Sequence, residues 1–486
     1  MTMLSLAQAA SLIPGAIVSG DGAVTFDRIS TDSRTAGPGD LFVALKGERF
    51  DAHDFVADVA RRGVSAVLVS RLPEGLAVPA IVAAGDGNGD TRVALGALAR
   101  GWRRQFTVPL VAVTGSNGKT TVKEMIASIF TAACGEDGRL ATAGNFNNDV
   151  GLPLTLLRLS AAHKLAVVEL GMNHPGETST LAKLAEPTIA LVNNAQREHQ
   201  EFMATVEAVA LEHASVIHAL AADGVAVFPA DDAYAGIWRA AATGNRVIDF
   251  ALADSGVAAG ASGPRAAVTG EFIGNRLRAA TPAGAFEASL QVLGAHNARN
   301  ALAATAAALA ANVPLDAIRR GLEAFSPVKG RLQVKHAAVG ALAGATVIDD
   351  TYNANPDSMR AAIDVLASMP APRVLVMGDM GEVGDNGLEF HREVGAYAGE
   401  RGIDALYALG DAGRDSCTAF VATAKPDAAA HHFDDVDALV AHLLSAGFGA
   451  GATLLVKGSR FMRMERVVDA LTQLQPPAPG AVPGAH

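Results

Sequence analysis

Short continuous apolar runs alternate with stretches of helical spacing along most of the chain. Residues 40–45 and 64–69 predict buried strands, and residues 53–62 between them predict a helix. Continuous rather than alternating apolar runs are typical of parallel strands that are covered on both faces. The pattern therefore predicts an α/β protein whose sheets are mostly parallel.

Changes in this pattern predict three domains. A small N-terminal α/β domain covers residues 1–105, a longer domain covers 106–327, and a third α/β alternation covers 328–486, with a tail after Gln475 that we expect to be mobile. The Gly-, Ala- and Ser-rich stretch 255–264 and the antiparallel-looking segments after it are interpreted as an elaboration of the middle domain. Further strands are expected at residues 165–170, 189–193, 225–228, 345–350, 373–377, 405–409 and 453–456.

Composition and charge narrow the class of protein. Half of the 486 residues are apolar and 18% are charged, which suits large buried cores and excludes a disordered or fibrous protein. The net charge of −11 argues against nucleic acid or anionic membranes as partners. Two cysteines are too few for a disulfide scaffold and fit a reducing cytoplasm. Because no apolar stretch approaches the ~20 residues of a membrane span, we expect a cytoplasmic protein without membrane insertion.

The strongest chemical signal is the segment TGSNGKTT at residues 114–121, which follows the apolar run 108–115 and precedes a helical stretch. A strand–loop–helix of this kind points backbone N–H groups and a helix N-terminus at one spot, which stabilises a polyphosphate. Lys119 adds a positive charge, and Thr120 adds a hydroxyl for Mg²⁺. Val113 replaces the first glycine of G-x-x-x-x-G-K-[ST], so an ordinary strand-to-helix turn is the alternative. We interpret the loop as a nucleotide triphosphate site formed by Gly115, Ser116, Asn117, Gly118, Lys119, Thr120 and Thr121.

Two further segments carry groups suited to a metal and a substrate. Glu169 ends the expected strand 165–170, where a carboxylate beside the loop can serve as a second Mg²⁺ ligand. The alternative is an incidental glutamate in a helix-capping loop. Asn145, Asn147 and Asn148 offer neutral donors and acceptors for a polar substrate, although asparagines taken singly are more often turn residues.

Motifs in the same order along the chain resemble the Mur ligase family, ATP-dependent amide-forming enzymes of peptidoglycan synthesis. Four separated motifs in register are more specific than any one of them. Within the family, the chain is most similar to the members that join D-alanyl-D-alanine to UDP-N-acetylmuramoyl-tripeptide. The motifs are TGSNGKTT at 114–121, ELGMNHPGE at 169–177, GAHNARN at 294–300 and DDTYNANP at 349–356, and the likeness extends from TDSR at 31–34 to KGSR at 457–460.

The resemblance implies a fold and a role for each domain. The N-terminal domain would bind the UDP part of the substrate, the central P-loop ATPase-like domain would bind ATP and Mg²⁺, and the C-terminal Rossmann-like domain would complete the ligase site. The residues that it implies for the uridine nucleotide are Thr31, Asp32, Ser33, Arg34 and Lys46.

The resemblance also implies the contacts in the cleft. Asn145, Asn147 and Asn148 match the motif for substrate and phosphate contacts, and Glu169 matches a Mg²⁺ ligand. Either Asp349 or Asp350 would contact the ribose. The resemblance implies that Arg331 reaches ATP at the domain junction. The residues implied for the adenine side are His296, Asn297 and Asn300. The residues implied to face the dipeptide are Tyr352, Asn353, Asn355 and Ser358. The implied catalytic group comprises Lys119, Glu169, Asn145 and His199.

The sequence departs from the family at the site of a second metal ion. Many relatives have a carbamylated lysine after an A-H-x-E segment, and it helps to hold that ion. Here Glu198-His-Gln-Glu201 is followed by ALEHAS at 210–215, with no lysine in reach. His199 stays a candidate metal or phosphate contact, and Glu212 and His213 are candidate substitutes for the lysine.

The implied reaction is a ligation through an acyl phosphate. ATP would phosphorylate the terminal carboxylate of the UDP-linked tripeptide, and the amine of D-alanyl-D-alanine would then attack, leaving ADP and phosphate. Positioning and charge neutralisation by Lys119 and by Mg²⁺ on Thr120 and Glu169 would carry the catalysis. Closure of the domains would exclude water. We expect the chain to act as a monomer.

Three other functions remain as alternatives. A sibling ligase that adds a diamino acid is disfavoured by the DDTYNANP motif and by the absence of D-N-P-R. Folylpolyglutamate synthetase is disfavoured by the N-terminal TDSR region. A nucleotide-dependent switch would hydrolyse ATP without ligation, and it would be indifferent to the other two substrates.

Overall fold

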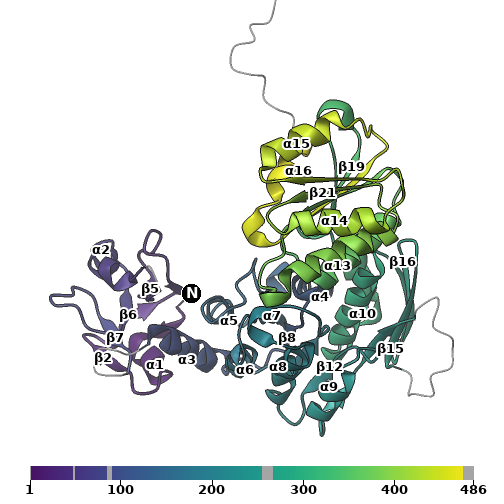
Figure 1. Ribbon diagram of the computed structural model, residues 1–486. Helices are drawn as coiled ribbons and strands as arrows, with labels where there is room; N and C mark the ends of the chain where they lie inside the picture. The colour runs from purple at the N-terminus through teal and green to yellow at the C-terminus, as the bar shows by residue number, and fades with distance from the viewer. Residues whose placement is uncertain (1, 48–49, 85–89, 254–265, 474–486) are drawn as a thin grey trace, which may run out of the picture.

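Three α/β domains follow one another along the chain in the computed structural model, which describes residues 2–47, 50–84, 90–253 and 266–473. In Figure 1 the N-terminal domain lies to one side of the central domain, and the C-terminal domain lies above it. The three-domain α/β architecture expected from the sequence is confirmed. The stretch 255–264 and the tail after Gln475 lie outside the described residues.

The N-terminal domain is built on a five-stranded sheet with the order β2-β7-β6-β5-β4. All neighbours are parallel except β2 and β7. The helix expected over 53–62 begins as a 3-10 turn over Ala52–Phe55. The strands are β2 (Ile17–Ser19), β4 (Arg28–Ser30), β5 (Asp40–Val43), β6 (Ala66–Val69) and β7 (Ala80–Val82), and the helices are α1 (Leu6–Ser11), α2 (Val56–Arg61) and α3 (Thr91–Arg103), which leads into the central domain.

The central sheet is entirely parallel and has the order β13-β12-β11-β8-β10-β9. Successive residues of β8 point to opposite faces, as expected for a strand. Leu110 and Ala112 enter one core, while Val111 and Val113 enter another. The strands are β8 (Leu110–Thr114), β9 (Arg139–Ala141), β10 (Leu165–Glu169), β11 (Ile189–Val192), β12 (Val225–Val227) and β13 (Arg246–Val247).

Helices cover both faces of this sheet. The core of one face includes residues of α3, α6 and α8, and that of the other includes residues of α4, α10 and α11. The alanine-rich α10 is buried along most of its length, because short side chains let its neighbours approach closely. The helices are α4 (Lys119–Cys134), α5 (Gly151–Leu156), α6 (Glu177–Ala185), α7 (Gln200–Met203), α8 (Val206–His218), α9 (Ala235–Ala241), α10 (Ala295–Ala310) and α11 (Leu315–Ala324).

A second, four-stranded sheet lies at the edge of the central domain, with the order β14-β15-β16-β17. The β15–β16 and β16–β17 pairs are antiparallel, as the alternating pattern predicted, whereas β14 pairs with β15 in parallel. The strands are β14 (Phe250–Leu252), β15 (Val268–Ile273), β16 (Arg276–Thr281) and β17 (Gly284–Ser289).

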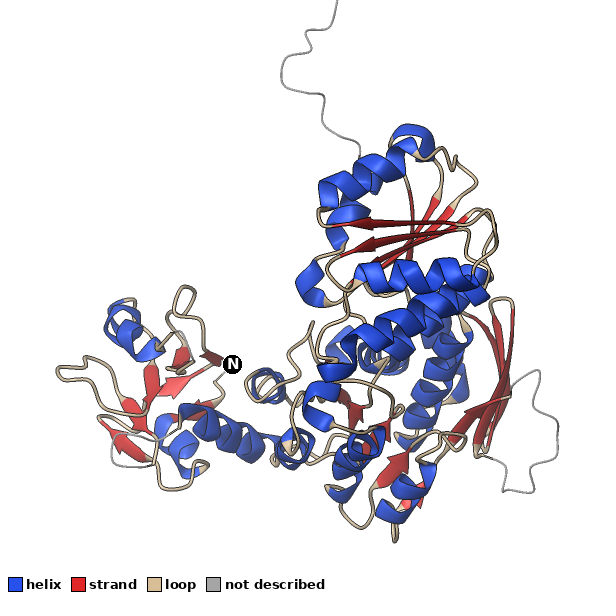
Figure 2. Ribbon diagram, viewed as in Figure 1, coloured by secondary structure: helices blue, strands red, loops and turns tan. Residues whose placement is uncertain are grey.

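The C-terminal sheet has the order β18-β19-β23-β20-β21-β22 and is parallel except for β18. Figure 2 shows its strands between helices on both faces. Among the described residues, no helix is long and apolar enough to span a membrane. The elements are β18 (Gln333–His336), β19 (Thr346–Asp350), β20 (Arg373–Gly378), β21 (Ala405–Leu409), β22 (Ala429–Phe433), β23 (Thr453–Lys457), α12 (Pro356–Ala367), α13 (Gly387–Glu400), α14 (Gly413–Thr423), α15 (Val436–Ser445) and α16 (Glu465–Thr472).

The packing of α11 on α4 yields a test of the fold. A Cβ atom at Gly321 would lie 2.3 Å from Ile129 Cα, so alanine there would push two helix backbones apart. Overpacking of this kind costs about 1–3 kcal/mol. Gly321→Ala should therefore lower the midpoint of thermal unfolding of the full chain in calorimetry.

Gly236→Ala is the matched control. Gly236 lies in α9, and among the described residues nothing lies within 4 Å of its Cβ position beyond its own neighbours. Replacing a helical glycine in open space should stabilise by about 0.5–1 kcal/mol. An unchanged or raised midpoint for Gly321→Ala would contradict the close helix packing.

Candidate functional site

The loop between β8 and α4 is built around two glycines with positive φ. Gly115 has a φ of 131°, and Gly118 has a φ of 80° immediately before α4. A Cβ atom at Gly118 would lie 2.7 Å from Asn300 Oδ1 and 2.8 Å from Asn193 Nδ2. Glycine at this position therefore lets the loop pack tightly against both α10 and the end of β11.

Two asparagines after β11 hold the backbone of this loop. The Asn117 N–H donates to Asn194 Oδ1 at 2.8 Å, and Asn193 Nδ2 donates to the Asn117 carbonyl at 2.8 Å. Asn193 Nδ2 also donates to Asn300 Oδ1 at 2.9 Å. Neither Asn193 nor Asn194 was predicted as a site residue. Their position at the carboxyl end of an expected parallel strand was the available signal.

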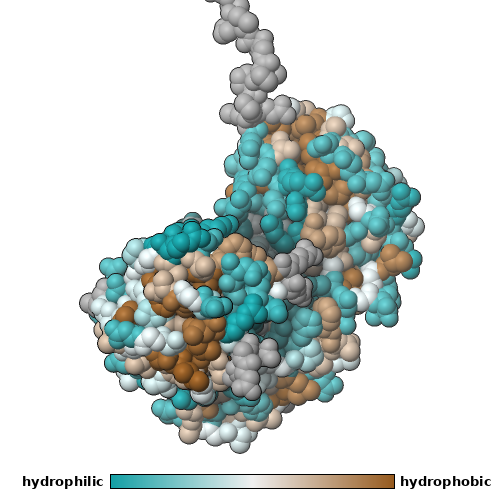
Figure 3. Space-filling view, turned by 90° about the vertical axis from the view of Figure 1, so that its left-hand side faces the viewer, coloured by the Kyte–Doolittle hydropathy of each residue, from teal (hydrophilic) through white to brown (hydrophobic). Residues whose placement is uncertain are grey.

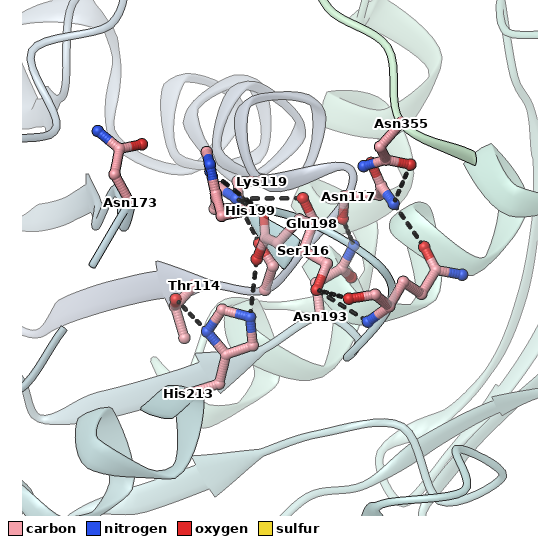
Figure 4. A network of polar contacts seen from close by, with 12 residues as sticks. Thr114, Ser116, Asn117, Lys119, Asn173, Asn193, Glu198, His199, His213 and Asn355 are labelled. Atoms are coloured by element: carbon pink, nitrogen blue, oxygen red, sulfur yellow. Dashed lines mark hydrogen bonds and ion pairs between the residues drawn. The ribbon is translucent and has the colours of Figure 1, made fainter. Parts of the chain in front are cut away.

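Lys119, the first residue of α4, folds back over the loop. Its Nζ atom donates to the Gly115 carbonyl at 2.5 Å, to the Ser116 carbonyl at 3.1 Å and to Glu198 Oε2 at 3.1 Å. Glu198 lies in the segment after β11 and is 6% exposed. Figure 4 shows Glu198 between Lys119, His199 and His213.

Glu198 is the centre of a buried charged network. Its Oε1 atom lies 3.1 Å from His213 Nε2, and His213 Nδ1 lies 3.0 Å from Thr114 Oγ1. Burial alone would raise the pKa of Glu198, but the charge of Lys119, the His213 hydrogen bond and the charges of His213 and His199 outweigh it and lower this pKa to about 2. The carboxylate is therefore ionised at neutral pH. Sequence reasoning named Glu198 only as part of a motif.

Glu169 ends β10 next to Thr120, as expected from the sequence. Its Oε1 atom accepts hydrogen bonds from Thr120 Oγ1 at 3.1 Å and from Asn147 Nδ2 at 2.8 Å. Its Oε2 atom is buried and has no hydrogen-bond partner among the described residues. An unpaired buried carboxylate oxygen beside a hydroxyl fits a Mg²⁺ ion, which commonly takes one or two protein carboxylates together with phosphate and water oxygens.

Glu169 and Thr120 are not accompanied by a larger acidic or histidine cluster. The described part of the chain contains no group of three or more His, Cys, Asp or Glu residues arranged to hold a metal ion. His199 pairs with Glu382, with Nδ1 and Oε2 2.7 Å apart, and its Nε2 lies 4.0 Å from Glu198 Oε2. Glu212 uses both carboxylate oxygens to accept the N–H groups of Gly176 and Thr178 at the start of α6.

The C-terminal domain touches the loop directly. Asn355 caps α12 and donates from Nδ2 to Asn117 Oδ1 at 2.9 Å, a contact visible in Figure 4. Arg331 Nη2 donates to Thr120 Oγ1 at 2.9 Å, and its guanidinium lies 4.2 Å from the centroid of the Tyr352 ring. Residues from two domains thus meet at the start of α4.

A second contact between these domains involves Arg197, the residue before Glu198. Its guanidinium pairs with Asp357 at 2.6 Å and with Glu393 at 2.6 Å. Its side-chain hydrogen bond is the main reason that the pKa of Glu393 lies below its usual value. Arg197 was not predicted as a site residue, because its partners are remote in sequence.

Most of the loop, together with Glu169, Glu198, His199, Arg331 and Asn355, lines one cavity of about 1260 Å³. This exceeds the usual volume of a site for one small ligand, which is about 300–1,000 Å³. In Figure 3, hydrophilic residues border the hollow between the C-terminal domain above and the rest of the molecule below. The predicted site residues that line the cavity are Ser116, Asn117, Gly118, Lys119, Thr120, Thr121, Asn145, Asn147, Asn148, Glu169, His199, His296, Asn297, Asn300, Arg331, Asp350, Tyr352, Asn353, Asn355 and Ser358.

The other predicted residues lie outside this cavity. Asp349 is buried and accepts from Lys335 Nζ at 2.7 Å and from Thr351 Oγ1 at 2.6 Å. Gly115, the first residue of the loop, packs against Asn193. The N-terminal group of Thr31, Asp32, Ser33, Arg34 and Lys46 belongs to the first domain.

The N-terminal group has its own local contacts. Arg34 Nη2 lies 2.7 Å from Asp32 Oδ2, and this hydrogen-bonded pairing lowers the pKa of Asp32 to about 2. Lys46 is exposed, and its backbone pairs with that of Asp51 in an isolated antiparallel β-bridge. The structure therefore places this group apart from the loop at 115–121.

Known proteins resemble the chain over nearly its whole length. The UDP-N-acetylmuramoyl-tripeptide–D-alanyl-D-alanine ligase of Escherichia coli K12 is 39% identical, covering 97% of this chain and 99% of its own. The corresponding Bacillus subtilis ligase is 33% identical, covering 92% and 93%. A crystal structure of MurF from Acinetobacter baumannii is 34% identical, with a TM-score of 0.85 and coverage of 97% and 99%.

Family models match three consecutive segments. The Mur ligase family catalytic domain matches residues 25–102, the Mur ligase middle domain matches 113–308, and the Mur ligase glutamate ligase domain matches 330–460. These segments contain most of the N-terminal sheet, the loop with nearly all of the central sheet, and the C-terminal sheet, respectively. Together with relatives aligned from end to end, these matches establish that the chain belongs to the Mur ligase family.

Proposed function

We propose that this chain is an ATP-dependent ligase that joins D-alanyl-D-alanine to UDP-N-acetylmuramoyl-tripeptide in peptidoglycan precursor synthesis. Relatives aligned over almost the entire chain carry this activity in their names. The use of ATP is supported by the geometry of the loop 115–121. There Lys119 and the start of α4 face a cavity that the C-terminal domain also lines. We further propose that the reaction takes place in the cytoplasm, which the low cysteine content fits, and that the chain acts as a monomer.

The reaction proceeds in two steps. A carboxylate oxygen of the tripeptide attacks the γ-phosphorus of ATP, the bond from that phosphorus to the bridging oxygen breaks, and ADP leaves. The amine of D-alanyl-D-alanine then attacks the acyl carbon, the acyl–oxygen bond breaks, and phosphate leaves while the amine loses a proton. Activation is required because an unmodified carboxylate is negatively charged and has no good leaving group.

The chain contributes mainly positioning and charge. Lys119 and the N-terminus of α4 stabilise the phosphate charge, and Arg331 reaches the same place from the C-terminal domain. Thr120 and Glu169 would hold Mg²⁺, which when bound neutralises charge on the transferring phosphates. Asn147 donates to Glu169 and Asn145 lines the same cavity, where both orient the acyl substrate.

The nucleotide and the dipeptide are assigned to different groups of residues that line this cavity. His296, Asn297 and Asn300 contact the adenine side, where burial lowers the pKa of His296 and keeps it neutral. Asp350, rather than the buried Asp349, contacts the ribose, because Asp350 lines the cavity. The residues that face the incoming dipeptide are Tyr352, Asn353, Asn355 and Ser358.

The uridine nucleotide is bound outside this cavity by the N-terminal domain. Thr31, Asp32, Ser33, Arg34 and Lys46 are assigned to that contact. Because they lie on a separate domain, the domains close around the assembled substrates before the phosphoryl group transfers. Closure protects the acyl phosphate from water.

The proposal predicts a strict substrate dependence of phosphate release. The purified chain should release phosphate from ATP only when both UDP-N-acetylmuramoyl-tripeptide and D-alanyl-D-alanine are present. A coupled assay for phosphate, run with each substrate omitted in turn, measures this dependence. Equal release without either substrate would favour a nucleotide switch and contradict the ligase.

A second prediction concerns Glu169. Glu169→Gln preserves shape but removes the charge of the carboxylate whose Oε2 atom is buried and unpaired among the described residues. The Mg²⁺ concentration for half-maximal ligation should rise at least about tenfold, and the rate should fall by about 10²-fold. Titration of ligation against Mg²⁺ measures both effects.

Glu207→Gln provides the matched control, because Glu207 is exposed on α8. It should leave the Mg²⁺ dependence unchanged. If Glu169→Gln also showed the wild-type Mg²⁺ dependence, Glu169 would have no role in holding the metal.

A further inference from the structure

The ammonium group of Lys119 has no hydrogen-bonding capacity left in this structure. An ammonium group carries three N–H donors, and Nζ is directed at three acceptors, namely the Gly115 and Ser116 carbonyls and Glu198 Oε2. Two acceptors belong to the loop itself, and Glu198 is the charged one. A phosphate oxygen can bond to Lys119 only if one of these contacts is given up.

Glu198 is held from the other side. Its Oε1 atom lies against His213, which is fully buried and also contacts the Thr114 hydroxyl. The neighbouring Arg197 and His199 both pair with carboxylates of the C-terminal domain. Because its side chain and both chain neighbours are anchored, Glu198 cannot follow Lys119 when Lys119 moves.

We propose that Glu198 is a positioning residue that occupies Lys119 as an internal substitute for phosphate, so that a nucleotide gains Lys119 only by displacing this carboxylate. This inference rests on the proposed ATP site. In this proposal, the Glu198 carboxylate and the nucleotide phosphates compete directly for the ammonium group of Lys119. The competition is strong because the pair is almost excluded from water, with Glu198 6% and the Lys119 side chain 16% exposed.

The released carboxylate keeps partners in the nucleotide-bound state. His213 stays in contact with Oε1, and His199 Nε2 lies 4.0 Å from Oε2. The cost of freeing Lys119 is therefore smaller than that of stranding a lone buried charge. This arrangement lowers affinity for nucleotide without preventing its binding.

The test is the nucleotide affinity of Glu198→Gln. The neutral amide has a similar shape but holds Lys119 less strongly, so the Kd for ATP, measured by titration calorimetry at fixed Mg²⁺, should fall about tenfold. Adenosine has no phosphate and should bind with unchanged Kd. Glu207→Gln, an equal charge change at an exposed residue of α8, should leave both values unchanged.

A double-mutant cycle with Lys119→Met shows whether the effect passes through Lys119. In that background, Glu198→Gln should no longer change the Kd for ATP. If it still tightened ATP binding there, Glu198 would act by direct repulsion of phosphate, and the inference would be wrong. Glu198→Asp keeps the charge and should stay closer to the wild-type Kd than Glu198→Gln does.

Other outcomes are equally decisive. Weaker ATP binding by Glu198→Gln would mean that Glu198 prepares Lys119 for phosphate rather than withholding it, and an equal change for adenosine would indicate a general structural role. Either result overturns the inference while leaving the ATP site intact. Failure of the wild-type chain to bind ATP would instead overturn the proposed function.

Discussion

The site depends on the close approach of one glycine to two asparagines. Gly118 stands against Asn193 at the end of β11 and Asn300 on α10, with no room for a Cβ atom. This contact fixes where α4 begins, and hence where its first N–H groups, Lys119 and Thr120 point. The β strand, the loop and α10 are adjacent in space although their residues are distant in sequence, so the integrity of the central core determines the geometry of the loop.

Buried carboxylates lie around this loop, and not all of their oxygens have hydrogen-bonding or cationic partners among the described residues. Glu198 has several cationic or hydrogen-bonding partners, whereas one oxygen of Glu169 has none among the described residues. Leaving a buried carboxylate oxygen without a partner is costly, and such an oxygen is typical of a site that a ligand or an ion completes. The C-terminal domain adds Arg331 and Asn355 to the same place. The proposed nucleotide and metal sites and the domain contact therefore share one small region.

Much of the fold and part of the site follow from local sequence. Strands such as β8, β10 and β11 are continuous apolar runs, and the loop carries glycine, lysine and threonine at adjacent positions, so both are readable without tertiary information. The roles of Glu198 and His213 are not, because each depends on a partner brought close by the sheet order. The same holds for Arg197. The choice between Asp349 and Asp350 also needs the structure, since adjacent residues of a strand face opposite sides.

The most direct test of the central claim is a crystal structure of the chain with Mg²⁺ and a non-hydrolysable ATP analogue. The β- and γ-phosphates should lie within hydrogen-bonding distance of the backbone N–H groups at 118–121, with Lys119 turned from Glu198 towards them. An analogue bound elsewhere, with Lys119 still on Glu198 and the loop carbonyls, would contradict the account.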